Sequence, residues 1–142
     1  MGENEKKDLP ASQIDRQNIL NNPYAVREIE KAAKIQSIPF EGKGVMIKEQ
    51  VASFFEVTSR TIENYIEQYG DELRNNGYEV LRGKRLKDLK LTLKAAFGSE
   101  TDFATKTTVL GIFDFRAFLN LAMLLTESKR ARLLRQEDVK SL

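Results

Sequence analysis

The spacing of apolar residues over residues 48–67 constrains the fold of this chain more than any other feature of its sequence. The apolar positions are Val51, Ala52 and Phe55, followed by Val57, Ile62, Tyr65 and Ile66. Each group marks one face of a helix, and Ala52 is small enough for two helices to cross closely. The pattern predicts a helix-turn-helix with a first helix over about 48–55 and a second over about 58–68.

The second helix of this pair is expected to present a polar face that duplex DNA could contact. Its candidate contacts are Thr58, Ser59, Arg60, Thr61 and Asn64. Arginine bridges O6 and N7 of guanine, and asparagine bridges N6 and N7 of adenine, so Arg60 and Asn64 are the candidates for base contacts. Thr58 and Ser59 are expected to cap the helix and offer a phosphate site. The alternative is an ordinary solvated helix face.

A basic stretch follows the predicted second helix. Between residues 82 and 94 the basic residues are Arg82, Lys84, Arg85, Lys87, Lys90 and Lys94, against the single acid Asp88. Residues 78–81 and 107–113 have strand character, and residues 82–85 read as a basic turn. The layout predicts a small β-hairpin wing on a mostly helical α+β, winged-helix-like domain. Arg82, Lys84, Arg85 and Lys87 would then contact phosphates or the minor groove, unless they are ordinary surface charge.

The rest of the chain is expected to form one domain over residues 21–142, behind a disordered polar tail over residues 1–20. Asn22 and Pro23 predict a helix start, with the helix reaching about residue 36. Residues 38–47 predict a hairpin, and the leucines of residues 86–93 fit helix or strand equally well. Asp114 is expected to cap one long helix that carries basic residues in its last turns, and the chain is expected to be a fragment of a longer protein. Those basic residues are Lys129, Arg130, Arg132 and Arg135, which would complement the helix dipole.

Composition excludes several classes of function. The chain has 142 residues, no cysteine and no histidine, which leaves no thiolate, no Cys/His zinc site and no histidine base. No spaced pair of acids suggests catalysis, so we expect a protein that is not an enzyme and needs no metal or cofactor. No apolar run is long enough to cross a membrane, and the start of the chain does not resemble a signal peptide, which predicts a cytoplasmic location.

Two segments resemble a known family. Residues 45–66 (VMIKEQVASFFEVTSRTIENYI) resemble the opening of the RhuM virulence-protein family, and residues 109–119 (VLGIFDFRAFL) are similar to its last strand and helix. The second segment is more loosely similar to the Bro-N and KilA-N domains of phage antirepressors. The resemblance covers about residues 38–135, departs at Ser53, Phe54 and Glu56, and does not extend over residues 86–106. It implies a DNA-binding regulator, or the DNA-targeting part, of a mobile-element, virulence or phage-defence protein.

Two hypotheses follow from these features. The first is sequence-specific binding of duplex DNA by a homodimer on an inverted repeat. The second is a protein–protein interaction module of the antitoxin or antirepressor type, in which an acidic face of the second helix binds a basic partner. That face would consist of Glu63, Glu67, Asp71 and Glu72.

Overall fold

The computed structural model describes residues 8–98 and 106–139 and has an α+β architecture. Helices dominate, and the described strands form one small antiparallel sheet. The elements are α1 (Gln13–Leu20), α2 (Pro23–Ala33), β1 (Ile38–Phe40), β2 (Lys43–Ile47), α3 (Lys48–Phe55), α4 (Ser59–Asn75), β3 (Tyr78–Leu81), α5 (Gly83–Phe97), β4 (Leu110–Asp114), α7 (Phe115–Leu124), α8 (Lys129–Leu133) and the π-helical turn η3 (Leu134–Val139).

The sheet has four strands in the order β1-β2-β4-β3, and all neighbours are antiparallel. The predicted hairpin over residues 38–47 is confirmed as β1 and β2. Its turn is left-handed at Glu41 (φ 52°) and Gly42 (φ 82°), as tight hairpin turns require. The strand predicted at residues 78–81 is β3, and the strand predicted at residues 107–113 is the shorter β4. The two central strands come from opposite halves of the sequence.

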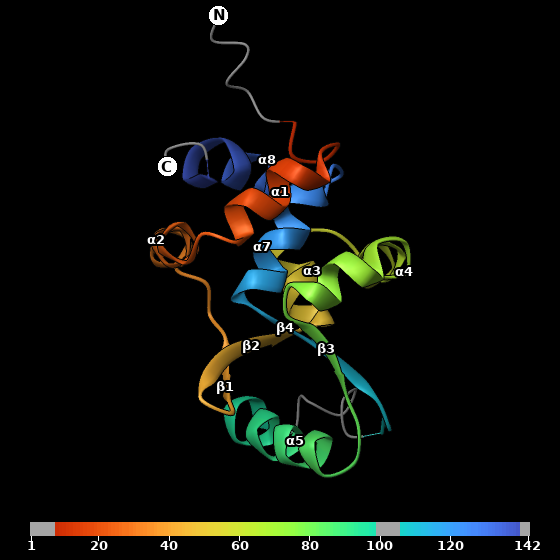
Figure 1. Ribbon diagram of the computed structural model, residues 1–142. Helices are drawn as coiled ribbons and strands as arrows, with labels where there is room; N and C mark the ends of the chain where they lie inside the picture. Colours follow the sequence, from red (N-terminus) through yellow and green to blue (C-terminus); the bar gives the residue numbers. More distant parts are fainter. Residues whose placement is uncertain (1–7, 99–105, 140–142) are drawn as a thin grey trace, which may run out of the picture.

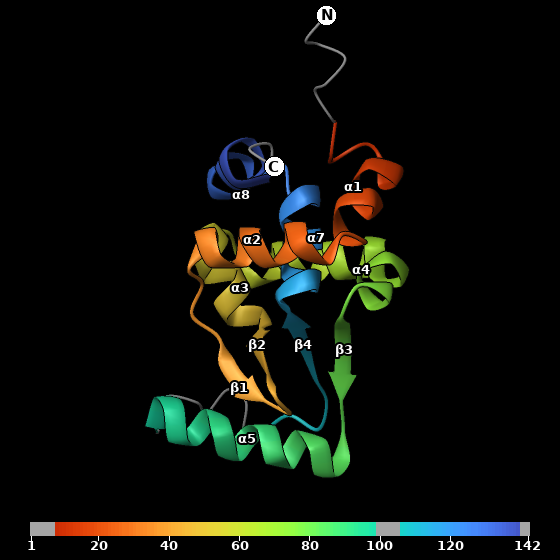
Figure 2. The same cartoon turned by 60° about the vertical axis from the view of Figure 1, so that its left-hand side comes forward.

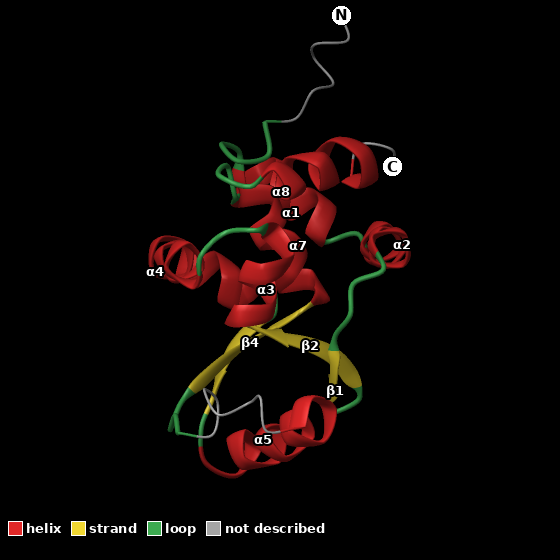
Figure 3. Cartoon of the chain, turned by 180° about the vertical axis from the view of Figure 1, so that it is seen from behind, coloured by secondary structure: helices red, strands yellow, loops and turns green. Residues whose placement is uncertain are grey.

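The sheet separates two layers of helices, each with its own apolar core. On one side α3, α4 and α7 pack against a core that includes Met46, Phe113 and Phe118. On the other side α5 alone covers the sheet, burying Leu86 and Leu89. Figures 1 and 3 show this separation, with α5 below the strands and the other helices above them. The layers determine which of the candidate residues share a surface.

The predicted wing is wrong, because residues 83–97 form the helix α5. Leu86, Leu89 and Leu93 recur at helical spacing and lie fully within the core on the far side of the sheet. Burying apolar area gives about 25 cal/mol per Å², and a tight turn after β3 would leave this sheet face uncovered. The strands β3 and β4 do pair, but a helix rather than a basic turn follows β3.

The N-terminal part is also more ordered than predicted. Residues 13–20 form α1, capped by the Ser12 side chain, which accepts from the Asp15 N–H at 3.2 Å. Leu20 is buried in the main core, and Arg16 is buried against α4. Residues 8–20 are therefore not a disordered tail, and residues 1–7 of that prediction lie outside the described part of the chain.

Several local predictions at helix ends are confirmed. The Asn22 side chain caps α2 and accepts from Ala25 N–H at 3.1 Å. The Asp114 side chain caps α7 and accepts from Ala117 N–H at 2.9 Å. Thr58, also expected to cap a helix, accepts from the Thr61 N–H at the start of α4. These ends depend on neighbours in the sequence, so the sequence pattern was sufficient to find them.

The long C-terminal helix is a further correction. The helix that begins after Asp114 ends at Leu124, and a second helix starts after Ser128. The Ser128 hydroxyl accepts from Ala131 N–H at 3.0 Å and so caps α8. Arg135 folds back and donates to the carbonyl of Leu125 at 2.8 Å, near the C-terminal end of α7. Its basic charge complements a helix end, as expected, but the end belongs to the preceding helix.

Candidate nucleic-acid interface

The connection between α3 and α4 spans residues 56–58 and is left-handed at Glu56 (φ 58°, ψ 43°). The backbone N–H of Val57 donates to the carbonyl of Ala52 at 3.0 Å and closes the end of α3. The Ser128 hydroxyl donates to the carbonyl of Phe55 at 2.7 Å. The turn is thus held by contacts within α3 and from α8, which fixes the direction in which α4 leaves.

The core positions predicted for this helix pair are confirmed. Val51, Ala52, Phe55 and Ile62 are buried. Val57, Tyr65 and Ile66 are partly buried against the same core. The predicted end near residue 68 coincides with a kink in α4 at Tyr69 (φ −115°, ψ 25°). A further helical stretch continues beyond the kink to Asn75 and buries Leu73 in the core.

Thr58 occupies the N-cap of α4, as predicted. Its Oγ1 accepts from the Thr61 N–H at 3.1 Å, and the two hydroxyl oxygens are also 3.1 Å apart. Ser59 is partly exposed in the same turn. The first turn of α4 therefore presents hydroxyls beside backbone N–H groups, an arrangement that favours an anion such as phosphate.

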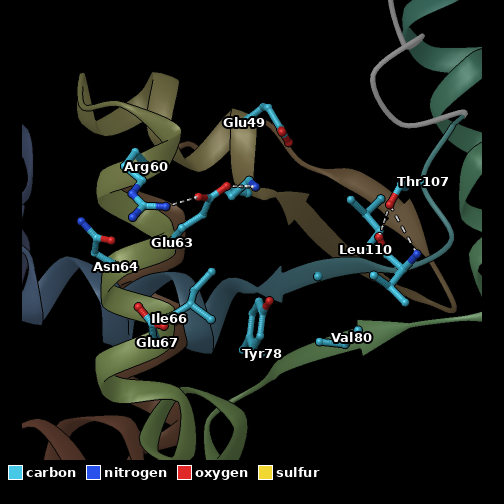
Figure 4. A pocket seen from close by; sticks show the side chains of 13 residues that line it. Glu49, Arg60, Glu63, Asn64, Ile66, Glu67, Tyr78, Val80, Thr107 and Leu110 are labelled. Carbon is cyan, nitrogen blue, oxygen red and sulfur yellow. Dashed lines mark hydrogen bonds and ion pairs between the residues drawn. The ribbon is translucent and has the colours of Figure 1, made fainter.

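Arg60 and Asn64 lie one helical turn apart on α4, and both are exposed. The Arg60 side chain is 80% exposed, with its guanidinium 3.8 Å from the Glu63 carboxylate. Figure 4 shows the Arg60, Glu63 and Asn64 side chains along the first turns of α4. The two base-contact candidates are therefore adjacent and accessible.

The acid nearest to these residues, Glu63, is held by cations. Lys48, from the start of α3, donates to its carboxylate at 2.5 Å. This hydrogen bond, with the charge of Lys48 and a smaller contribution from Arg60, lowers the pKa of Glu63 below its usual value. Its negative charge is therefore matched within the protein, which reduces the repulsion that a phosphate would otherwise meet.

The predicted acidic face is only partly present. Glu67 and Asp71 are exposed on α4, and Asp71 pairs with Arg74 at 2.6 Å. Glu72 is buried against Arg16, because α4 turns this side chain toward α1 rather than toward solvent. The prediction that Glu72 belongs to an exposed acidic face is therefore wrong.

The basic residues after β3 lie in the other layer. Arg82 is the N-cap of α5, and Lys84 and Lys87 are exposed on that helix. Lys84 pairs with Asp88 at 3.1 Å, one turn along. Because the sheet separates α5 from α4, these cations do not form a wing beside the first turns of α4 (Figures 1 and 2).

Arg85 is already engaged by two carboxylates. Its guanidinium donates to Glu41 at 2.6 and 2.9 Å and to Glu79 at 2.5 Å. The hydrogen bonds to Glu41, then to Glu79, raise the pKa of Arg85 above its usual value. The guanidinium also lies 5.9 Å from the centre of the Phe40 ring. These contacts connect β1, β3 and α5. They occupy most of the N–H groups that the Arg85 guanidinium could donate to a phosphate.

A cleft of about 570 Å³ opens beneath α4, and sequence reasoning did not find it. The first turns of α4 form one wall, and the outer parts of β3 and β4 form the other (Figure 4). Lys48, Glu49, Val80 and Val109 line it in addition to the predicted Arg60 and Asn64. The alternation of side chains along β3 is the sequence signal that could have indicated the cleft, since it places Val80 on the same sheet face as Tyr78.

The described residues contain no cluster of three or more acids placed to hold a metal ion. None of the helices in the described ranges is long and apolar enough to span a membrane. Comparisons of the chain with known protein families, with curated proteins and with solved structures gave no match. The resemblance to the RhuM family therefore stays a prediction that rests on the quoted residues.

Proposed function

We propose that the protein binds duplex DNA by placing the first turns of α4 in the major groove. The observation that carries this proposal is the pair Arg60 and Asn64, exposed one turn apart on a helix whose entry turn is fixed. A recognition helix reads bases with residues near its N-terminus, and these two side chains offer bidentate donors and acceptors. Each such contact discriminates by about 1–3 kcal/mol against a wrong base.

The surrounding side chains support this orientation. The hydroxyls and N–H groups around Thr58 offer a phosphate contact at the end of α4. Lys48 neutralises Glu63, which leaves Glu56 in the entry turn and Glu67 on α4 as the exposed acids of this helix pair near the proposed surface. In this proposal Arg82, Lys84 and Lys87 contribute long-range attraction from the other layer rather than wing contacts.

The biological role proposed here follows the resemblance in the sequence. The protein would act as a transcriptional regulator, or as the DNA-targeting domain of a mobile-element, virulence or phage-defence protein. Operators with inverted repeats would be bound by a homodimer, because two-fold protein symmetry matches two-fold sequence symmetry.

The test is fluorescence anisotropy with random duplex DNA across a salt series, followed by selection of a preferred sequence. Binding should weaken steeply as salt rises, since phosphate neutralisation releases counterions. On the selected sequence, Arg60→Ala should lower affinity about tenfold, which corresponds to about 1.4 kcal/mol. Asn64→Ala should relax the preference at one base position.

Arg27→Ala is the matched control. Arg27 is exposed on α2, which lies on the opposite side of α7 from α4 (Figure 1), and its removal changes net charge by the same amount. A double variant, Lys84→Ala with Lys87→Ala, should reduce affinity for all sequences alike. Equal losses in Arg60→Ala and Arg27→Ala, or an absence of binding at low salt, would overturn the proposal.

A further inference from the structure

The floor of the cleft beneath α4 is an uncovered stretch of sheet. Tyr78 and Val80 share one face of β3; Tyr78 is buried, whereas Val80 is 41% exposed. Val109, just before β4, is 38% exposed, and Ile66 of α4 lies partly buried at the opposite wall. The helical layer therefore stops short of the outer end of the sheet and leaves apolar side chains that a further segment could cover.

The strand beside this floor has an open edge. In the strand order β1-β2-β4-β3, β3 pairs only with β4 among the described strands (Figure 2). The Asp114 N–H donates to the Gly77 carbonyl at 3.5 Å, so hydrogen-bonded pairs fall at residue 77 and at every second residue after it. The backbone N–H and C=O groups of Tyr78 and Val80 therefore point away from β4. An open edge of this kind accepts an added strand.

The charges around the cleft favour a basic occupant. The charged side chains that line it are Lys48, Glu49, Arg60, Glu63 and Glu67. Lys48 and Arg60 both lie within ion-pair distance of Glu63. Glu49 and Glu67 thus carry the acidic excess, and the buried Oε1 of Glu49 has no hydrogen-bond donor among the described residues. A buried carboxylate oxygen without a donor is unfavourable, and a lysine or arginine entering the cleft would supply one.

We propose that this cleft binds an extended segment of a protein partner, which adds to the sheet as a strand beside β3. Alternate side chains of that segment would be apolar, packing on Val80, and at least one would be basic, directed at Glu67. The proposal does not require that DNA binds, but Arg60 and Asn64 line this cleft and also belong to the proposed DNA surface. A bound segment and a duplex would therefore compete for α4.

The experiment is selection of random heptapeptides displayed on phage against the full chain, with the Val80→Lys variant as the parallel target. A lysine on an edge strand opposes strand addition, and Val80 is exposed enough for the variant to fold, which circular dichroism checks. We expect enriched peptides to alternate apolar and other residues and to contain lysine or arginine. Synthesised peptides should bind the Val80→Lys and Glu67→Lys variants at least tenfold more weakly than the unmodified chain.

Leu91→Lys is the matched control, because Leu91 is an exposed apolar residue on α5, in the other layer. This variant should bind the peptides as the unmodified chain does, and amide resonances of Tyr78 and Val80 should shift on titration. The proposal is overturned if no peptide prefers the unmodified chain over Val80→Lys. It is also overturned if the chain is a dimer that Val80→Lys dissociates, since a second copy would then occupy the edge. Neither outcome depends on whether DNA binds.

Discussion

Arg16 in α1 and Glu72 in α4 form a two-pronged ion pair across 56 positions of the sequence, with Nε–Oε2 and Nη2–Oε1 distances of 2.7 Å. Their side chains are only 5% and 7% exposed. Asn120 of α7 donates to the same carboxylate at 2.7 Å and accepts from Asn76 at 2.9 Å. Three helices that are distant in the sequence are thus joined by polar groups that satisfy one another.

The first prediction concerns this pair. Glu72→Gln should lower the free energy of unfolding by about 3–5 kcal/mol, because Arg16 would keep a buried charge without its counter-ion. Urea unfolding at neutral pH measures the change. Glu67→Gln, which alters an exposed residue of the same helix, should change stability by less than about 0.5 kcal/mol. Equal effects in the two variants would show that the ion pair has no special role.

The same pair predicts a dependence of stability on pH. Burial acts to raise the pKa of Glu72, but hydrogen bonds from Arg16 and Asn120 outweigh it and lower the pKa below its usual value. The stabilisation is therefore complete above the unfolded pKa of about 4.3 and is lost as pH falls through the folded pKa. The stability difference between the unmodified chain and Glu72→Gln should shrink in acid. A difference that stays constant from pH 7 to pH 3 would contradict this.

A further prediction concerns Gly77, where α4 ends. Its φ is 116°, and a Cβ there would collide with the carboxylate of Asp114, the N-cap of α7. Gly77→Ala should therefore cost about 2–4 kcal/mol from backbone strain and overpacking together. Gly42→Ala is the control, since Gly42 also has a positive φ but open space around it, and should cost about 1 kcal/mol. Thermal unfolding of both variants compares the two costs.

The turn between α3 and α4 offers a stabilising change. Glu56 has φ 58°, a conformation that costs a residue with a Cβ about 1–2 kcal/mol relative to glycine. Glu56→Gly should raise stability by up to about 1 kcal/mol, after allowing for the greater freedom of glycine in the unfolded chain. Glu56→Ala removes the carboxylate but keeps the Cβ, and it should give no such gain. A gain in both variants would assign the effect to charge instead.

The contact between Arg85 and Glu41 can be tested by titration. The hydrogen bond from Arg85 lowers the pKa of Glu41 below its usual value, and smaller charge effects from Arg85 and Lys43 act in the same direction. In Arg85→Met the pKa of Glu41 should rise toward the ordinary glutamate value, as measured by carbon-13 NMR of the carboxylate. In Lys84→Met, which removes a neighbouring charge paired with Asp88, it should stay lowered.

The elements that could be predicted from sequence are those whose causes are local. Asn22 and Asp114 cap helices through hydrogen bonds to residues three positions along, so their sequence patterns are sufficient. The α3–α4 pair could be predicted because the spacing of its apolar residues indicates which faces two adjacent helices bury against one another. The separation of α5 from α4 could not be predicted, because leucine spacing shows that residues 86–93 are buried but not on which side of the sheet.

By itself the sequence determined the helix starts at Asn22, Thr58 and Asp114, the β1–β2 hairpin and the exposed pair Arg60 and Asn64, since each depends on neighbours within a few positions. Only the tertiary structure decided that α1 is ordered, that Arg85 is bound by two carboxylates and that a cleft opens beside Val80. Arg16 needs Glu72, 56 positions away, and α5 needs an uncovered sheet face formed by strands from both halves of the chain. Contacts between distant segments carry no local pattern, and they fix where Arg16 meets Glu72 and where Arg85 meets Glu41.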